Sequence, residues 1–182
     1  PHIPYQRQDF KDQPHAPISA ARTLRMIPGQ DIVGIKTRVV TFDTHSKQYE
    51  GFANMVFENM RAMPLFIDYV TERKLDEDSV IVALDAGRVS EARKFAAILD
   101  RDLVIIDKRR PKPGVAHVYT VIGKEKVDGK RAIAYEDMVD SGSTVEPSAE
   151  ALYKLGATDV YVCAPHLLAS PSEDGTAEDK MR

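Results

Sequence analysis

Apolar and polar positions follow one another along the chain in a repeating order of strands and helices. Continuous apolar runs occupy residues 79–84, 103–107 and 132–135, which is the pattern of parallel strands covered on both faces. Helical patterns lie between or after these runs, including an amphipathic stretch at residues 65–74. This order predicts an α/β fold with a parallel sheet.

The remaining segments give weaker signals. Residues 1–17 contain four prolines and read as an extended loop, followed by a helix at 20–27 that Pro28 and Gly29 end. Ser19 is expected to cap that helix. The other expected elements are a strand at 38–43, a connecting segment at 53–64, a helix at 90–99, a strand and hairpin within 115–130 that turns at 128–129, a helix over 150–155 closed by Gly156, a last strand at 160–164, and a polar, disordered tail at 170–182.

Composition excludes some classes of function. The 182 residues, 43% of them apolar, can build a core in one domain or in one and a half small ones. A net charge of −3 gives no reason to expect nucleic acid or an anionic membrane surface as a partner. No apolar run approaches the roughly 18 residues of a membrane-spanning helix. The single cysteine, Cys163, rules out an internal disulfide and favours a cytoplasmic location.

Residues 131–149 contain the clearest chemistry. An apolar strand ends in Glu136 and Asp137, and a small, hydroxyl-rich loop at residues 140–144 then precedes a helix. Free backbone N–H groups and the positive end of the helix dipole at this point suit a phosphate. The plainer alternative is that Asp140 or Ser141 only caps the helix. The two carboxylates favour a binding site, since they are placed to hold ribose hydroxyls or a metal.

Three further loops at strand ends carry candidate side chains. His45 follows the strand at 38–43, Asp85 follows the strand at 79–84, and a basic segment at residues 108–114 follows the strand at 103–107. Each has a plainer interpretation: a structural histidine, an ordinary Asp-Gly turn and a solvated basic loop. A mobile loop rich in lysine and arginine is also what closing over a triphosphate requires.

Together these stretches resemble one family. Residues 136–144 resemble the phosphoribosyl-binding loop of type I phosphoribosyltransferase folds, and residues 5–12, 43–52 and 107–111 are similar, in the same order, to stretches of ribose-phosphate pyrophosphokinases. The resemblance implies a parallel-sheet, phosphoribosyltransferase-like (Rossmann-like) fold with helices on both faces. It also implies a partial first domain at residues 1–62, a second domain at 63–169, and a tail at 170–182.

The resemblance further assigns residue roles. Lys108 would stabilise the transferring group and Arg110 would hold the sugar phosphate, while His45 and Asp85 would serve Mg²⁺. Asp85 would assist either a second metal ion or the ribose. ATP would be held by Arg7, Gln8 and Asp12. The ribose phosphate would be held by Glu136, Asp137, Asp140, Ser141, Gly142, Ser143 and Thr144.

The implied reaction is transfer of diphosphate from Mg-ATP to ribose 5-phosphate, which forms 5-phosphoribosyl 1-diphosphate and AMP. The resemblance also implies a homo-oligomer, and relative to the family the chain lacks parts of both domains. Arg88 stands where the family has glycine, and together with Ser143 it leaves open a larger acceptor such as ADP-ribose. A catalytically silent regulatory homologue is the third possibility.

Overall fold

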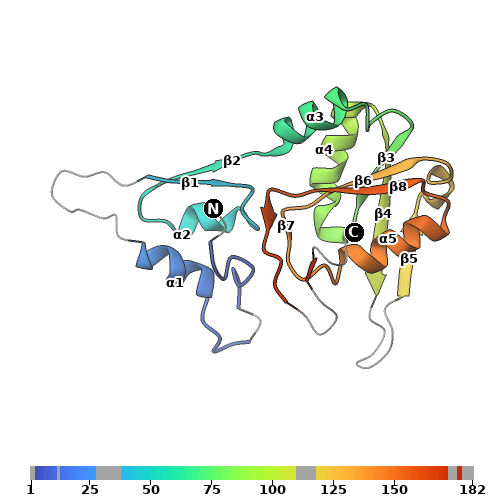
Figure 1. Cartoon of the computed structure of the whole chain (residues 1–182). Helices are drawn as coiled ribbons and strands as arrows, with labels where there is room; N and C mark the ends of the chain where they lie inside the picture. Colours follow the sequence, from blue (N-terminus) through green and yellow to red (C-terminus); the bar gives the residue numbers. More distant parts are fainter. Residues whose placement is uncertain (1–2, 12, 28–37, 110–117, 172–175, 178–182) are drawn as a thin grey trace. The chain divides into compact units, whose positions relative to one another are not determined.

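The computed structural model describes residues 3–11, 13–27, 38–109, 118–171 and 176–177. The chain divides into two compact units, Pro1–Ala62 and Met63–Arg182 (Figure 1). That the first unit is part of a phosphoribosyltransferase-like domain stays a prediction.

Unit 1 pairs two helices with a two-stranded parallel sheet. Its elements are α1 (Ser19–Met26), β1 (Arg38–Phe42), α2 (Gln48–Phe52) and β2 (Val56–Met60). β1 and β2 pair in register from Arg38 with Val56 to Phe42 with Met60. Leu24 of α1, Tyr49 of α2 and Ile3 of the first loop are buried together and form the apolar centre of this unit.

Unit 2 is built on a five-stranded sheet with the order β5-β4-β3-β6-β8, in which only β5 is antiparallel. Its helices are α3 (Met63–Glu72), α4 (Val89–Leu99) and α5 (Val145–Lys154), with short 3-10 turns at Ala86–Arg88 and Lys124–Lys126. Its strands are β3 (Ser79–Ala83), β4 (Asp102–Arg109), β5 (Val118–Ile122), β6 (Arg131–Tyr135), β7 (Met138–Val139), β8 (Asp159–Cys163) and β9 (His166–Leu167).

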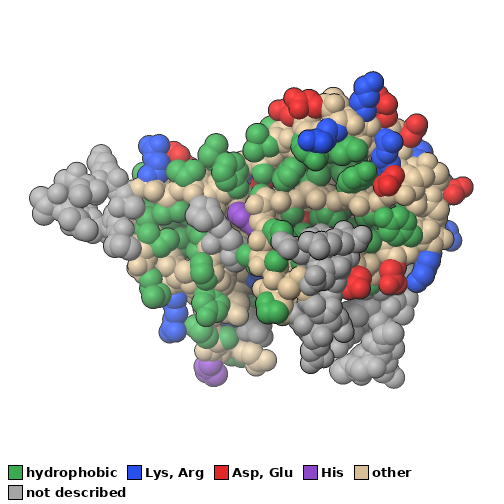
Figure 2. Space-filling view, viewed as in Figure 1, with side chains coloured by type: hydrophobic (Ala, Val, Ile, Leu, Met, Phe, Trp, Pro, Cys, Tyr) green, Lys and Arg blue, Asp and Glu red, His purple; other side chains and the backbone are tan. Residues whose placement is uncertain are grey.

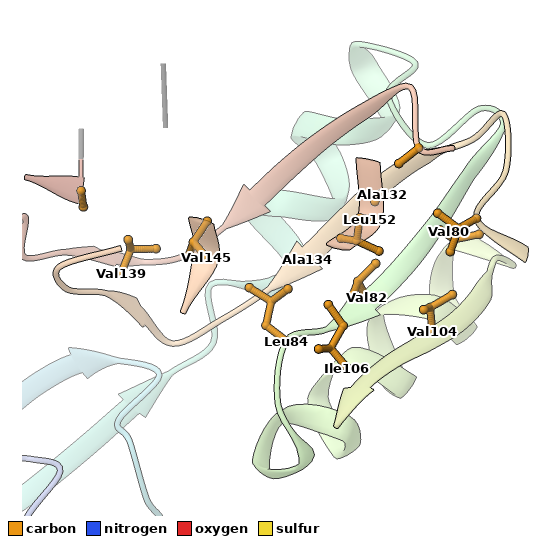
Figure 3. Close-up of a cluster of buried hydrophobic side chains, with 13 residues drawn as sticks. Val80, Val82, Leu84, Val104, Ile106, Ala132, Ala134, Val139, Val145 and Leu152 are labelled. Atoms are coloured by element: carbon orange, nitrogen blue, oxygen red, sulfur yellow. The ribbon is translucent and has the colours of Figure 1, made fainter. Parts of the chain in front are cut away.

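Alternation along the central strands produces two cores, one on each face of the sheet. Val80 and Val82 of β3 lie in one cluster with Leu152 of α5 (Figure 3), whereas Ile81 and Ala83 lie in the other cluster, with residues of α3 and α4. Every residue of β3 is buried, which explains its unbroken apolar sequence. The predicted α/β fold with helices on both faces is therefore confirmed.

Several local predictions differ from the structure. The segment predicted as a connection contains β2, and α2 precedes it. β5 pairs with β4, so no hairpin turns at residues 128–129, although Gly129 does adopt a positive φ of 71°. Ile18, not Ser19, occupies the N-cap position of α1. Ala177, predicted to be in a disordered tail, is buried in the core of unit 2.

The surface of unit 2 is mixed in charge. On the face seen in Figure 2, acidic and basic side chains lie interspersed over unit 2. Among the described residues, no helix combines the length and apolar character needed to cross a membrane.

Candidate active site

The carboxyl ends of three neighbouring strands in unit 2 bring the main candidate residues together. β3 pairs in parallel with both β4 and β6, so the segments that follow these strands emerge at the same edge of the sheet. Asp85 comes just after β3, Glu136 follows β6 directly, and Lys108 lies near the end of β4. This edge is where ligands bind in open α/β sheets.

Asp85 closes the turn that follows β3. It occupies the N-cap position of the 3-10 turn Ala86–Arg88, and its Oδ1 accepts a 3.0 Å hydrogen bond from the backbone amide of Arg88. A Cβ at Gly87 would lie 3.2 Å from the same oxygen, so the turn approaches the carboxylate closely. The result is a tight turn that holds the backbone of Arg88 next to Asp85.

Arg88 points its guanidinium at the carboxylates that follow β6. Its Nη2 lies 2.9 Å from Oδ2 of Asp137, and its Nε lies 3.8 Å from Oε2 of Glu136. The Arg88 side chain is 14% exposed and both carboxylates are 7% exposed. The guanidinium is therefore shared unequally, with a direct charge-assisted contact to Asp137 and a longer one to Glu136.

Glu136 has a strongly raised pKa. Burial, followed by the charge of Asp85, raises its pKa to about 8, and Asp137 adds to the increase. The positive charges of Arg88 and Lys108 act against this shift without cancelling it. Oε1 of Glu136 is buried and has no hydrogen-bond partner, which marks a polar atom prepared for a ligand.

The prediction that Lys108 lies in a mobile loop is wrong, because its backbone belongs to strand β4. Lys108 lies inside β4 and is aligned with Tyr119 of β5, because the antiparallel pairing extends the strand to Arg109. Burial lowers the pKa of its ammonium, while the charges of Asp85 and Glu136 raise it. Lys108 thus faces the acidic edge from a rigid strand. Arg110 lies outside the described residues.

The candidate phosphate loop joins β7 to α5. Gly142 has a φ of 78°, in the left-handed region that favours glycine, and its carbonyl accepts a 3.0 Å hydrogen bond from the amide of Glu146. Thr144 is the N-cap residue and makes no side-chain capping bond, so neither Asp140 nor Ser141 occupies the cap position. The Ser141 hydroxyl donates to that of Ser143 at 3.2 Å. The loop therefore presents hydroxyl groups at a helix N-terminus.

Unit 1 holds the other candidate metal residue in an ordered turn. His45 is half-buried and follows Asp43, whose Oδ2 accepts a 2.8 Å hydrogen bond from the amide of Ala62. Asn59 holds the intervening Thr44 through its Oδ1 and Nδ2. The turn is thereby fixed between β1 and the end of β2.

The candidate ATP residues of unit 1 lie in its first loop. Arg7 and Gln8 are exposed, and the carbonyl of Gln8 accepts a 3.2 Å hydrogen bond from the amide of Ala20 in α1. This bond ties the loop to the helix. Asp12 lies outside the described residues.

The candidate metal residues fit magnesium only if the ion also takes ligands from water and substrate. The described residues contain no group of three or more histidine, cysteine or acidic side chains that could hold a metal ion by themselves. Magnesium commonly takes one or two protein carboxylates and completes its shell with water and substrate phosphates. Asp85 can supply such a carboxylate, so these residues fit an ion that arrives with a nucleotide.

Sequence reasoning missed the contacts that organise these residues. It noted Arg88 as a departure but not as the partner of Glu136 and Asp137, although a cation and two acids after neighbouring strands give a signal. It also missed Asn59 and Arg61, which hold the turn before His45, because β2 was taken as a connection.

The whole chain is similar to several known proteins. Residues 54–180 match the model of the phosphoribosyl transferase domain. Curated relatives named ribose-phosphate pyrophosphokinase include one from Listeria monocytogenes, 39% identical over 94% of this chain and 52% of its own. Another, from Caldanaerobacter subterraneus, is 37% identical over 100% of this chain and 56% of its own. The crystal structure of phosphoribosylpyrophosphate synthetase from Mycobacterium smegmatis superposes with a TM-score of 0.79 and 36% identity, covering 93% of this chain and 53% of that one.

The chain belongs to the phosphoribosyl transferase domain family. Its curated relatives confirm the resemblance to ribose-phosphate pyrophosphokinases. It spans about half the length of the curated relatives it matches.

Proposed function

We propose that this chain takes part in the transfer of diphosphate from Mg-ATP to ribose 5-phosphate, which yields 5-phosphoribosyl 1-diphosphate and AMP. The observation that carries the proposal is the meeting of Lys108, Asp85 and Glu136 at one edge of the unit 2 sheet, in a chain up to 39% identical to proteins named for this activity.

Each part of the site has a role in this reaction. The loop at residues 140–144 holds the 5-phosphate through backbone N–H groups and hydroxyls. Glu136 and Asp137 take ribose hydroxyls, and the acceptor hydroxyl attacks the β-phosphorus so that AMP leaves. Lys108 and Arg110 neutralise charge that develops on the transferred group. Positioning of the reactants supplies much of the acceleration.

The nucleotide side of the proposal uses the first loop and the His45 turn of unit 1, and Asp85 of unit 2. Arg7, Gln8 and Asp12 contact ATP, and His45 and Asp85 serve Mg²⁺. When bound with the nucleotide, Mg²⁺ supplies charge neutralisation at the phosphate oxygens. The functional protein is a homo-oligomer in the cytoplasm, as the family resemblance implies.

The experiment is acceptor-dependent release of AMP. The protein is incubated with Mg-ATP alone, with added ribose 5-phosphate, or with added ADP-ribose, and AMP is measured by mass spectrometry. We expect AMP with ribose 5-phosphate at a rate well above the other two. Faster AMP release with ADP-ribose would show that ADP-ribose, and not ribose 5-phosphate, is the acceptor. If neither acceptor increases AMP release, the protein is a silent homologue.

A further inference from the structure

Two basic side chains, Arg88 and Lys108, lie at the same edge of the unit 2 sheet as three carboxylates. Arg88 contacts Asp137 at 2.9 Å and reaches towards Glu136 at 3.8 Å. Lys108 is influenced by the charges of Asp85 and Glu136. Arg88 thus contacts Asp137 directly, and the charge of Glu136 acts on both cations.

A buried pair of neighbouring acids needs compensating positive charge once both are ionised, which for Glu136 occurs near its raised pKa of about 8. Two such acids repel each other and lose hydration, and a divalent cation is a common solution. In this chain the Arg88 guanidinium already lies within direct contact of Asp137, on a turn whose geometry Asp85 fixes. A metal ion at the pair would have to displace a permanent charge that carries its own fixed donors.

We propose that the Arg88 guanidinium is the resident cation of Glu136 and Asp137, so that this pair binds hydroxyl groups of a sugar phosphate and not a divalent metal ion. Arg88 acts as a positioning residue, since it holds Asp137 and leaves Oε1 of Glu136 without a protein partner. A hydrogen bond from a sugar hydroxyl to that oxygen would not compete with the contact between Arg88 and Asp137, because Oε1 takes no part in it. The part that concerns the sugar rests on the proposed function, and the exclusion of a metal ion does not.

Arg88 also separates metal binding at Asp85 from hydroxyl binding at Glu136 and Asp137. Asp85 is left for a metal ion carried by the nucleotide, because the side chain of Arg88 turns away to the segment after β6 while its backbone amide stays with Asp85. A glycine at position 88 would keep the turn and remove the charge. The selection between hydroxyl and metal at the pair therefore depends on this one side chain.

The test is titration with Mn²⁺ in the absence of nucleotide, followed by electron paramagnetic resonance of the free ion. We expect Arg88→Ala to gain one Mn²⁺ site, about tenfold tighter than any in the parent protein, because the pair loses its compensating charge. Arg88→Lys, which keeps a cation, should titrate as the parent does. Arg88→Ala combined with Asp137→Asn should lose the gained site.

Two results would overturn the proposal. One is a parent protein that already binds Mn²⁺ at a site abolished by Asp137→Asn, and the other is a folded Arg88→Ala protein that titrates like the parent. Arg88→Met, which keeps the aliphatic volume, replaces Arg88→Ala if circular dichroism shows that the alanine variant is unfolded. Calorimetry of ribose 5-phosphate binding without metal tests the sugar assignment separately from the exclusion of a metal ion. A gained Mn²⁺ site in a protein that never binds the sugar would refute only the sugar assignment.

Discussion

The backbone amide of Arg88 donates a 3.0 Å hydrogen bond to Oδ1 of Asp85, so a proposed metal residue also holds the turn that follows β3. Oδ1 of this carboxylate closes the turn, and in our proposal Oδ2 serves the metal ion. The structural and the functional role of Asp85 can therefore be separated by two substitutions.

Asp85→Asn keeps an acceptor oxygen for the Arg88 amide but removes the negative charge. We expect the variant to unfold at nearly the parent temperature and to need more magnesium for half-maximal activity. Asp85→Ala loses the cap as well, which costs about 0.5–2 kcal/mol of stability. Thermal unfolding and magnesium titration of both variants check this. Equal magnesium requirements in Asp85→Asn and the parent would return Asp85 to a purely structural role.

Gly142→Val tests the phosphate loop. Valine is strained at a φ of 78°, and the change of backbone it requires should disturb the loop amides. We expect binding of ribose 5-phosphate to weaken by roughly 1–3 kcal/mol, the scale of lost hydrogen bonds to a charged group, with ATP binding little changed.

Gly129→Val is the matched control for backbone strain. Gly129 also has a positive φ, of 71°, but it lies in the turn before β6, and no atom is within 4 Å of a Cβ placed there. Calorimetry should show unaltered sugar affinity for this variant. A folded Gly142→Val protein that binds the sugar as tightly as Gly129→Val does would remove the loop from the site.

Glu136→Gln should flatten the pH dependence of stability. The folded pKa of Glu136 is about 8, against an ordinary 4.5, because of burial and the nearby charges of Asp85 and Asp137, which Arg88 and Lys108 only partly offset. The unfolded chain releases the proton first, so the contribution of Glu136 is complete below pH 4.5 and is lost as the pH rises to about 8.

Urea unfolding between pH 5 and pH 8, without metal or nucleotide, measures this contribution. We expect the free energy of unfolding of the parent to fall more steeply with pH than that of Glu136→Gln, in which the amide mimics the protonated acid. Parallel curves for the two proteins would mean that Glu136 is ionised throughout this range.

Lys108→Ala should act mainly on turnover. Lys108 is held on β4 beside the acidic edge, so its charge is placed before the reaction begins. Loss of one such donor is expected to lower kcat by about 10²–10³, while KM for ATP changes much less. Lys108→Arg keeps the charge and should retain more activity. A rise in KM at constant kcat would make Lys108 a simple phosphate anchor.

The sequence predicted the central elements of unit 2 well because their signals are local. β3 and β6 are apolar after their first residues, and Gly142 and Gly156 mark turns that need a left-handed backbone. The segment of β2 was missed because its side chains are exposed or only half-buried and it pairs with β1 alone. Its strand state depends on a partner, not on its own pattern.

The position of Lys108 was misjudged for a related reason. A run of cations before prolines has the composition of a loop, whereas pairing with β5 extends β4 through Arg109. The contact between Arg88 and Asp137 joins residues far apart in the chain, and only the order of β3 and β6 in the sheet brings them together. Such contacts depend on topology that residue patterns do not contain.

The fate of the diphosphate tests the proposed reaction most directly. ATP labelled with ¹⁸O on its β- and γ-phosphoryl groups is incubated with magnesium, ribose 5-phosphate and the protein. The masses of all products are then measured by mass spectrometry. We expect unlabelled AMP and an equal amount of sugar product that carries both labelled phosphoryl groups, with neither formed when Lys108→Ala replaces the parent on the same timescale. ADP with a sugar that gained one phosphoryl group, or labelled free diphosphate beside unchanged ribose 5-phosphate, would contradict the proposed function.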